Sequence, residues 1–221
     1  MLSYSSVLNP ALLSPNATDI RATPEDVSWI SASLGFAGVL GFFIIPPFFQ
    51  HFGRKSVHIV LNCLMILGFF IFKYANSVKA LYVGKFIQGV ATCGVTITVI
   101  IIAEYSHPKR RGYFMTFKKA STALGSLICH SLYFSLSWRQ IALVATIPYS
   151  LSNLLIYFWP ESPAYLAMKG RYDECDESHT WLFGDSRKAK TDLDELIRAQ
   201  TERRNRNKNT AKDLTHLEDI T

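Results

Sequence analysis

The stretch VSWISASLGFAGVLGFFIIPPFF, residues 27–49, decides the fold class because it holds no charged residue. At about 1.5 Å per residue, a helix of this length crosses the roughly 30 Å hydrocarbon core of a bilayer. Thr23 can cap such a helix, and Pro24 suits its first position. Glu25 and Asp26 then lie at the positive end of the helix dipole. The stretch predicts a membrane-spanning helix that begins near Thr23.

Four further apolar stretches repeat this pattern, and two lysines, Lys118 and Lys119, interrupt one of them. Their approximate bounds are 57–75, 80–103, 113–136 and 140–159. The sequence therefore predicts an all-α polytopic membrane protein, with five transmembrane helices in a bundle over residues 27–159. Residues 160–221 are polar and predict a cytoplasmic helical region with a tail.

The net charge of +6 is unevenly distributed along the chain. Up to Trp159 there are twelve Lys and Arg against four acids, whereas from Pro160 onward there are eleven against thirteen. The basic residues form short clusters between apolar stretches, which is typical of topology signals and argues against nucleic-acid binding. The four cysteines have no metal-ligand spacing. We expect no metal, no cofactor and no enzymatic activity, and the lipid bilayer as a partner.

Basic residues also predict the orientation. One side of the predicted bundle carries Arg54, Lys55, Lys109, Arg110, Arg111, Lys169 and Arg171, and the other carries Arg21, Lys73, Lys79 and Arg139. The positive-inside rule places the larger set in the cytoplasm. The N-terminus is then extracellular and the C-terminus cytoplasmic. The sequon at Asn16 lies on the predicted outer side and is a candidate glycosylation site.

The polar region should hold two or three short surface helices. Ser162 and Pro163 suit a helix start, and Gly170 suits its end. A second apolar stripe precedes Gly184, and a third, weaker one follows Thr191. Beyond about Arg203 the chain is strongly charged, and we expect it to fray.

Four charged residues fall within or beside the predicted spans. Glu104 is the only carboxylate between residues 27 and 159. Arg110 and Arg111 are expected to pair with it, either as a topology anchor or as an ion pair that breaks between two conformations. Lys85 can extend to the outer interface. Lys118 and Lys119 point about 100° apart on a helix, so at least one should face protein or a cavity.

Three motifs in these loops resemble those of a known family. Gly53-Arg54-Lys55 is similar to the end of the signature loop of the major facilitator superfamily. The run from Glu104 to Gly112 resembles the acid-to-arginine-glycine signature of sugar porters, and residues 159–166 resemble their proline-glutamate-serine-proline signature. The details look most like insect facilitated trehalose transporters and their relatives.

The resemblance implies an N-terminal half of a twelve-helix sugar transporter of the plasma membrane, facilitated or proton-linked, working by alternating access. Residues 1–26 then comprise a truncated first helix and an extracellular loop, and a C-terminal half is missing if the gene model is incomplete. The substrate is a small solute, expected to be a sugar. The expected cytoplasmic gate consists of Gly53, Arg54, Lys55, Glu104, Arg110, Arg111 and Glu161, and the expected cavity residues are Lys119, Lys85 and Thr122.

One departure from the family pattern leaves two alternatives open. Lys119 aligns with the glutamine that bonds the sugar, and an ammonium donates hydrogen bonds but cannot accept them. Burying a cation against neutral hydroxyls is costly. The chain could therefore transport a different solute, such as an anionic one, or be a truncated remnant that does not transport.

Overall fold

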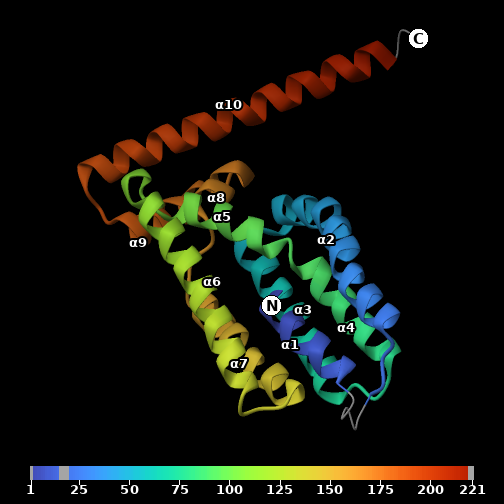
Figure 1. Ribbon diagram of the computed structural model, residues 1–221. Coiled ribbons are helices and arrows are strands. Elements are labelled where there is room, and N and C mark those ends of the chain that lie inside the picture. The colour runs from blue at the N-terminus through green and yellow to red at the C-terminus, as the bar shows by residue number, and fades with distance from the viewer. Residues whose placement is uncertain (1, 15–19, 219–221) are drawn as a thin grey trace.

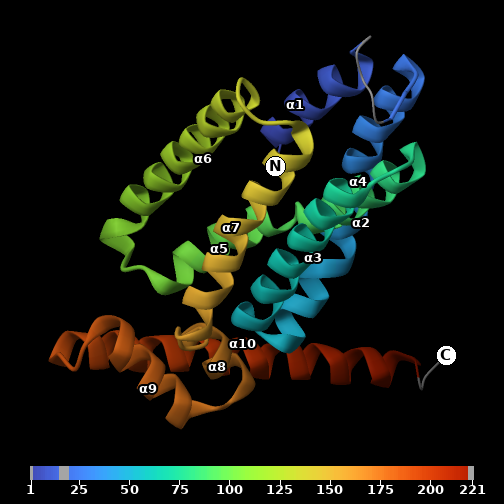
Figure 2. The same ribbon diagram turned by 90° about the horizontal axis from the view of Figure 1, so that it is seen from below.

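The computed structural model describes residues 2–14 and 20–218, and among these it contains helices and no strand. The helices are α1 (Leu2–Leu13), α2 (Pro24–Phe52), α3 (Arg54–Tyr74), α4 (Val78–Ala91), α5 (Gly94–Tyr105), η1 (Pro108–Arg110), α6 (Arg111–Tyr133), α7 (Trp138–Tyr157), α8 (Pro163–Lys169), α9 (Tyr172–Phe183) and α10 (Arg187–Glu218). Helices α1 to α7 form a bundle (Figure 1), and α8, α9 and α10 lie across one end of it (Figure 2). This end carries the candidate site.

The predicted helix starts are confirmed by the hydrogen bonds at their caps. Thr23 Oγ1 accepts a hydrogen bond from the Asp26 amide at 3.2 Å, and Asp26 Oδ2 accepts one from the Thr23 amide at 2.9 Å. Ser162 caps α8, and Gly170 ends it in the left-handed conformation. These local signals were sufficient because each cap depends on residues within three or four positions.

Four segments have the length and apolar composition of membrane spans among the described residues. They are Pro24–Phe52, Arg54–Tyr74, Val78–Tyr105 and Trp138–Tyr157. Helix α6, which covers most of the stretch predicted at 113–136, is not among them, because Arg111, Lys118 and Lys119 lower its apolar character. A polytopic helical fold is thus established, whereas the number of five spans remains a prediction.

The span predicted at 80–103 as one helix is divided into α4 and α5. Between them, the amides of Thr92, Val95 and Thr96 donate to carbonyls three residues earlier, at 3.0 Å each. These are the tighter bonds of a 3₁₀ turn. Gly89 and Gly94 flank the turn and have weak helix propensity. The sequence prediction missed this break because the apolar run continues through it.

The core depends on close approach between helices. Helix α2 packs along α4, and α3 packs along both α4 and α7. A Cβ atom added to Gly41 would lie 2.5 Å from the Val90 carbonyl oxygen, and one added to Gly89 would lie 2.5 Å from the Ala37 Cβ. Glycine is therefore required where α2 and α4 touch, as is common for packing in lipid.

Apolar residues also cover much of the outer surface of the bundle. Phe36 and Phe43 on α2 are 65% and 76% exposed, and no residue of α6 is buried. Such a surface is expected where the surrounding solvent is hydrocarbon.

The polar C-terminal region departs from prediction at its end. Helix α10 continues to Glu218, beyond the point near Arg203 where fraying was expected. Its sequence includes five arginines, four lysines and four leucines, which are good helix formers, and opposite charges recur at helical spacing. High charge therefore did not exclude a helix here.

Candidate functional site

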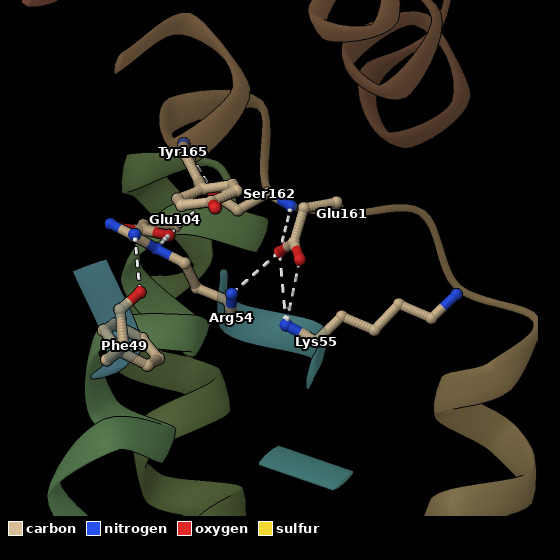
Figure 3. Close-up of polar contacts among 7 residues, drawn as sticks. All are labelled: Phe49, Arg54, Lys55, Glu104, Glu161, Ser162 and Tyr165. Atoms are coloured by element: carbon tan, nitrogen blue, oxygen red, sulfur yellow. Dashed lines mark hydrogen bonds and ion pairs between the residues drawn. The ribbon is translucent and has the colours of Figure 1, made fainter. Parts of the chain in front are cut away.

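Charged side chains, a serine hydroxyl and backbone amides from three separate junctions meet at the end of the bundle next to α8, and the Lys55 side chain itself points away from them (Figure 3). The α2–α3 junction supplies Arg54 and Lys55, the end of α5 supplies Glu104, and the α7–α8 segment supplies Glu161 and Ser162. We call these five residues the charge network. Each lies at a helix end, so the network joins α3, α5 and α8.

Arg54 and Glu104 form the central ion pair. Arg54 Nε donates to Glu104 Oε2 at 2.8 Å, and Arg54 Nη2 donates to Glu104 Oε1 at 2.7 Å. The two side chains are only 11% and 15% exposed. A two-bond pair shielded in this way is stronger and more directional than a surface ion pair.

The surroundings of Arg54 hold its guanidinium in place. Its carbon lies 4.7 Å from the centre of the Phe49 ring and 5.1 Å from that of Tyr165. Ser162 Oγ donates to Glu104 Oε2 at 2.6 Å, which orients the carboxylate from the other side. Stacking on rings suits an arginine better than a lysine. The site therefore specifies arginine at this position.

Glu161 binds the N-terminus of α3 through its carboxylate. Glu161 Oε1 accepts from the backbone amides of Arg54 at 3.0 Å and Lys55 at 3.2 Å, and from its own neighbour Ser162 at 2.9 Å. The first amides of a helix have no partner within it, and the helix dipole makes this end positive. The Glu161 carboxylate accepts hydrogen bonds from these amides and places a negative charge at the positive helix end. It thereby couples the α7–α8 segment to α3.

Gly53 makes this approach possible. Its φ of 95° lies in the region that favours glycine. A Cβ atom there would overlap Glu161 Oε2 and meet the Tyr165 ring at 3.0 Å. Any other residue would strain the backbone and displace the carboxylate from the helix end.

Tyrosine hydroxyls and a serine join the surrounding segments to the network. Tyr105 donates to the Pro160 carbonyl at 3.1 Å, Tyr165 donates to the His51 carbonyl at 2.7 Å, and Ser178 of α9 donates to the Glu161 carbonyl at 2.6 Å. Burial, followed by the negative charge of Glu161, raises the pKa of Tyr165. Its hydroxyl therefore remains a hydrogen-bond donor at neutral pH.

The structure brings together five of the seven residues expected at the gate: Gly53, Arg54, Lys55, Glu104 and Glu161. Glu104 pairs with Arg54, however, and not with Arg110 or Arg111. Those two arginines are exposed, and neither has an ion pair with any side chain that the structure describes. The reason is geometric: Arg54 binds both Glu104 oxygens, so the carboxylate is already paired.

The predicted cavity residues do not form one cluster. Lys85 is fully buried: its Nζ donates to Ser5 Oγ at 2.6 Å and lies about 5.5 Å from the Tyr4 and Phe72 ring centres. The expectation that Lys85 extends to the interface is therefore wrong, because α1 covers it. Lys119 and Thr122 are both exposed on α6.

Two more predictions concern Lys118 and Asn16. Lys118 Nζ donates to the Val95 carbonyl at 2.8 Å, so one of the adjacent lysines does face protein. Asn16 lies outside the described residues, and its glycosylation stays a prediction. In the part of the chain that the structure describes, no group of three or more His, Cys, Asp or Glu could hold a metal.

Three polar residues have surroundings in the structure that sequence reasoning did not anticipate. Ser162 was predicted only as a cap, and Tyr165 was not singled out. Gln88 is fully buried, and within the described residues its amide has no hydrogen-bond partner. Its spacing of three residues from Lys85 could have indicated a shared helix face.

Comparison with known proteins identifies the family. The model of the family described as "Sugar (and other) transporter" matches residues 3–220. The facilitated trehalose transporter Tret1 of Polypedilum vanderplanki is 25% identical over 205 residues, which cover 90% of this chain and 40% of that protein. The mouse solute carrier family 2, facilitated glucose transporter member 8, is 29% identical over 189 residues, which cover 83% and 39%. The chain thus spans about two fifths of the length of these relatives.

Solved structures show the same fold. The proton:xylose symporter XylE bound to 6-bromo-6-deoxy-D-glucose matches with a TM-score of 0.76 at 17% identity, over 91% of this chain and 49% of that one. An inward-open conformation of XylE from E. coli matches with a TM-score of 0.72 at 18% identity, over 88% and 50%. The arrangement of the bundle is therefore that of a major facilitator half. Together with the family match, it shows that the chain belongs to the sugar transporter family of the major facilitator superfamily.

Proposed function

We propose that the chain forms the N-terminal half of the transport unit of a sugar transporter that works by alternating access. Family membership and the names of its relatives, which include trehalose and glucose transporters, support a sugar substrate. The proposed location is the plasma membrane, with the charge network on the cytoplasmic side and the N-terminus outside. The basic residues near the network support this orientation.

The observation that carries this proposal is the shielded ion pair of Arg54 and Glu104. It joins the start of α3 to the end of α5, two helix ends that must separate if the bundle reorganises at this face. A charge-assisted pair of this kind favours one arrangement and is lost in the other, which is the requirement for a two-state element. In this proposal the pair is intact when the cytoplasmic side is closed.

A second candidate, transport of an anionic solute, is favoured by Lys119. Its ammonium is exposed on α6, and no described residue provides it with a carboxylate. Lys119 stands where the family resemblance implies a sugar-binding glutamine. In a transport cavity an unpaired cation attracts anions and contributes little to neutral hydroxyls.

Uptake into proteoliposomes that carry this chain tests both candidates. Saturable uptake of labelled glucose or trehalose, inhibited by the unlabelled sugar, is expected for the first. Sugar transport that rises in Lys119→Gln would support the same assignment. Uptake of a labelled carboxylate that falls in Lys119→Gln would favour the second candidate. Absence of saturable uptake of either solute would contradict transport by this chain.

Orientation and glycosylation can be tested on cells. We expect a maleimide reagent that cannot cross membranes to label Arg110→Cys only after permeabilisation, and Lys79→Cys before it, each in a background without Cys63. A downward shift of the chain on a gel after glycosidase treatment, absent in Asn16→Gln, would support glycosylation. Labelling of Arg110→Cys in intact cells would contradict the proposed orientation.

A further inference from the structure

A cavity of about 470 Å³ lies between α3, α5, α6 and α7, and Arg54 is part of its lining. This volume is within the range of small-molecule sites. Its walls are mostly apolar and include Ile102, Leu155 and Trp159. The cavity is partly open, so material from the surroundings can enter it.

The walls indicate what can fill this space. Water does not occupy an apolar cavity stably, because it needs several polar partners there. Helices α3 and α7 and the α4–α5 segment have the composition of membrane spans. The apolar material available around such helices is the acyl chain of a lipid, which is present at very high local concentration.

The polar groups of the cavity select for negative charge. Its lining includes Arg54, Lys55 and His58 but no aspartate or glutamate. Arg54 is neutralised by Glu104, whereas Lys55 Nζ donates, among the described residues, only to the Tyr157 carbonyl, at 2.9 Å, so further donor positions of the ammonium remain. His58 Nδ1 is buried and has no partner among the described residues. Both side chains are on the first turns of α3.

We propose that this cavity binds an anionic phospholipid, with one acyl chain between α5 and α7 and the phosphate at Lys55 and His58. With the orientation proposed above, this end of the bundle faces the inner leaflet, where anionic lipids are concentrated. The proposal needs the chain to be embedded in a membrane but does not need it to transport sugar.

Native mass spectrometry of the detergent-purified chain, titrated with phosphatidylserine or phosphatidylcholine, tests the proposal. We expect phosphatidylserine to bind more tightly, and Lys55→Ala to weaken its binding about fivefold, as expected for one cation at a lipid surface. The matched control is Lys79→Ala, which removes an exposed lysine at the other end of the bundle. Thr98→Phe, which fills the cavity, should abolish the tight binding.

Quenching of tryptophan fluorescence locates the acyl chain by a method independent of native mass spectrometry. Phosphatidylserine with brominated chains should quench the wild type more than Trp159→Phe, because Trp159 lines the cavity. Equal affinity for the two lipids would overturn the role of the phosphate. Tight binding or quenching that persists in Thr98→Phe would overturn the location. A two-chain mass without bound lipid would assign the cavity to a second copy of the chain.

Discussion

Arg54 and Lys85 are both buried cations in the same bundle, and they are stabilised in different ways. Arg54 shares two hydrogen bonds with a carboxylate and stacks on two rings. Lys85 is less exposed but has a hydroxyl and two ring faces, and no described carboxylate pairs with it. Burying a charge is costly unless it is paired. The comparison suggests that Arg54 stabilises the fold, whereas Lys85 costs stability.

Removing the partner of Arg54 should have the largest effect. Glu104→Ala leaves a shielded guanidinium without its counter-charge, so we expect the free energy of unfolding to fall by about 3 kcal/mol. Unfolding of the purified protein in mixed micelles measures this. The double variant Arg54→Met, Glu104→Leu should regain much of the loss. If Glu104→Ala were as stable as the wild type, the Arg54–Glu104 pair would contribute nothing to the free energy of unfolding.

Removing the charge of Lys85 should change the free energy of unfolding in the opposite direction. Lys85→Met keeps a similar length without the charge, and we expect the free energy of unfolding to rise by roughly 2 kcal/mol. Lys79→Met on the surface is the control and should change little. In a Ser5→Asp background, where Lys85 gains a carboxylate, Lys85→Met should instead destabilise. The same sign in both backgrounds would contradict the difference between paired and unpaired cations.

A substitution at Gly53 tests whether the stability of the charge network also depends on backbone geometry. Gly53→Ala should lower the free energy of unfolding by about 1–2 kcal/mol, because of its positive φ and the overlap with Glu161. Gly112→Ala, at a position with open space, is the matched control. In Glu161→Ala, which removes the overlapping carboxylate, the cost of Gly53→Ala should become smaller. An unchanged cost would mean that φ alone determines it.

His179 extends the comparison to a group that remains neutral when buried. Burial lowers its pKa below the usual 6.5, against the raising effects of Asp192 and Asp176. The unfolded chain then binds a proton more readily than the folded one, so stability is present above about pH 6.5 and falls as the pH drops below it. We expect a small decrease in melting temperature from pH 7 to 5, reduced in His179→Phe. An identical pH dependence in the variant would contradict this role.

Local signals predicted the fold better than the contacts of the site. Thr23, Ser162 and Gly170 each act within one helical turn, and the sequence placed those helix ends correctly. From the residues alone, Glu104 was expected to pair with Arg110 or Arg111, which follow it by six and seven residues, whereas Arg54 is 50 residues away and entered the expected gate only through the family resemblance. Sequence proximity does not determine which arginine reaches the carboxylate. The relative placement of α3 and α5 determines which arginine reaches Glu104.

The environment of Lys85 was also not predictable from the sequence around it. One turn into an apolar stretch, a lysine is expected to extend toward the interface. Whether it can do so depends on what covers it, and here α1, whose twelve residues are too few to span a bilayer, places Tyr4 and Ser5 over the ammonium. No pattern around residue 85 encodes that neighbour.

Only Gly53 separates Phe52, the last residue of α2, from Arg54, the first residue of α3. Two antiparallel helices joined by one residue cannot slide far past each other at that end, so Gly53 is the point about which α3 can tilt relative to α2. Helix α3 is about 30 Å long at 1.5 Å per residue, so a tilt of about 10° about Gly53 would displace its opposite end by about 5 Å. A small change of helix angle at the charge network would thus become a displacement of several ångströms at the opposite end of α3, at the other face of the membrane.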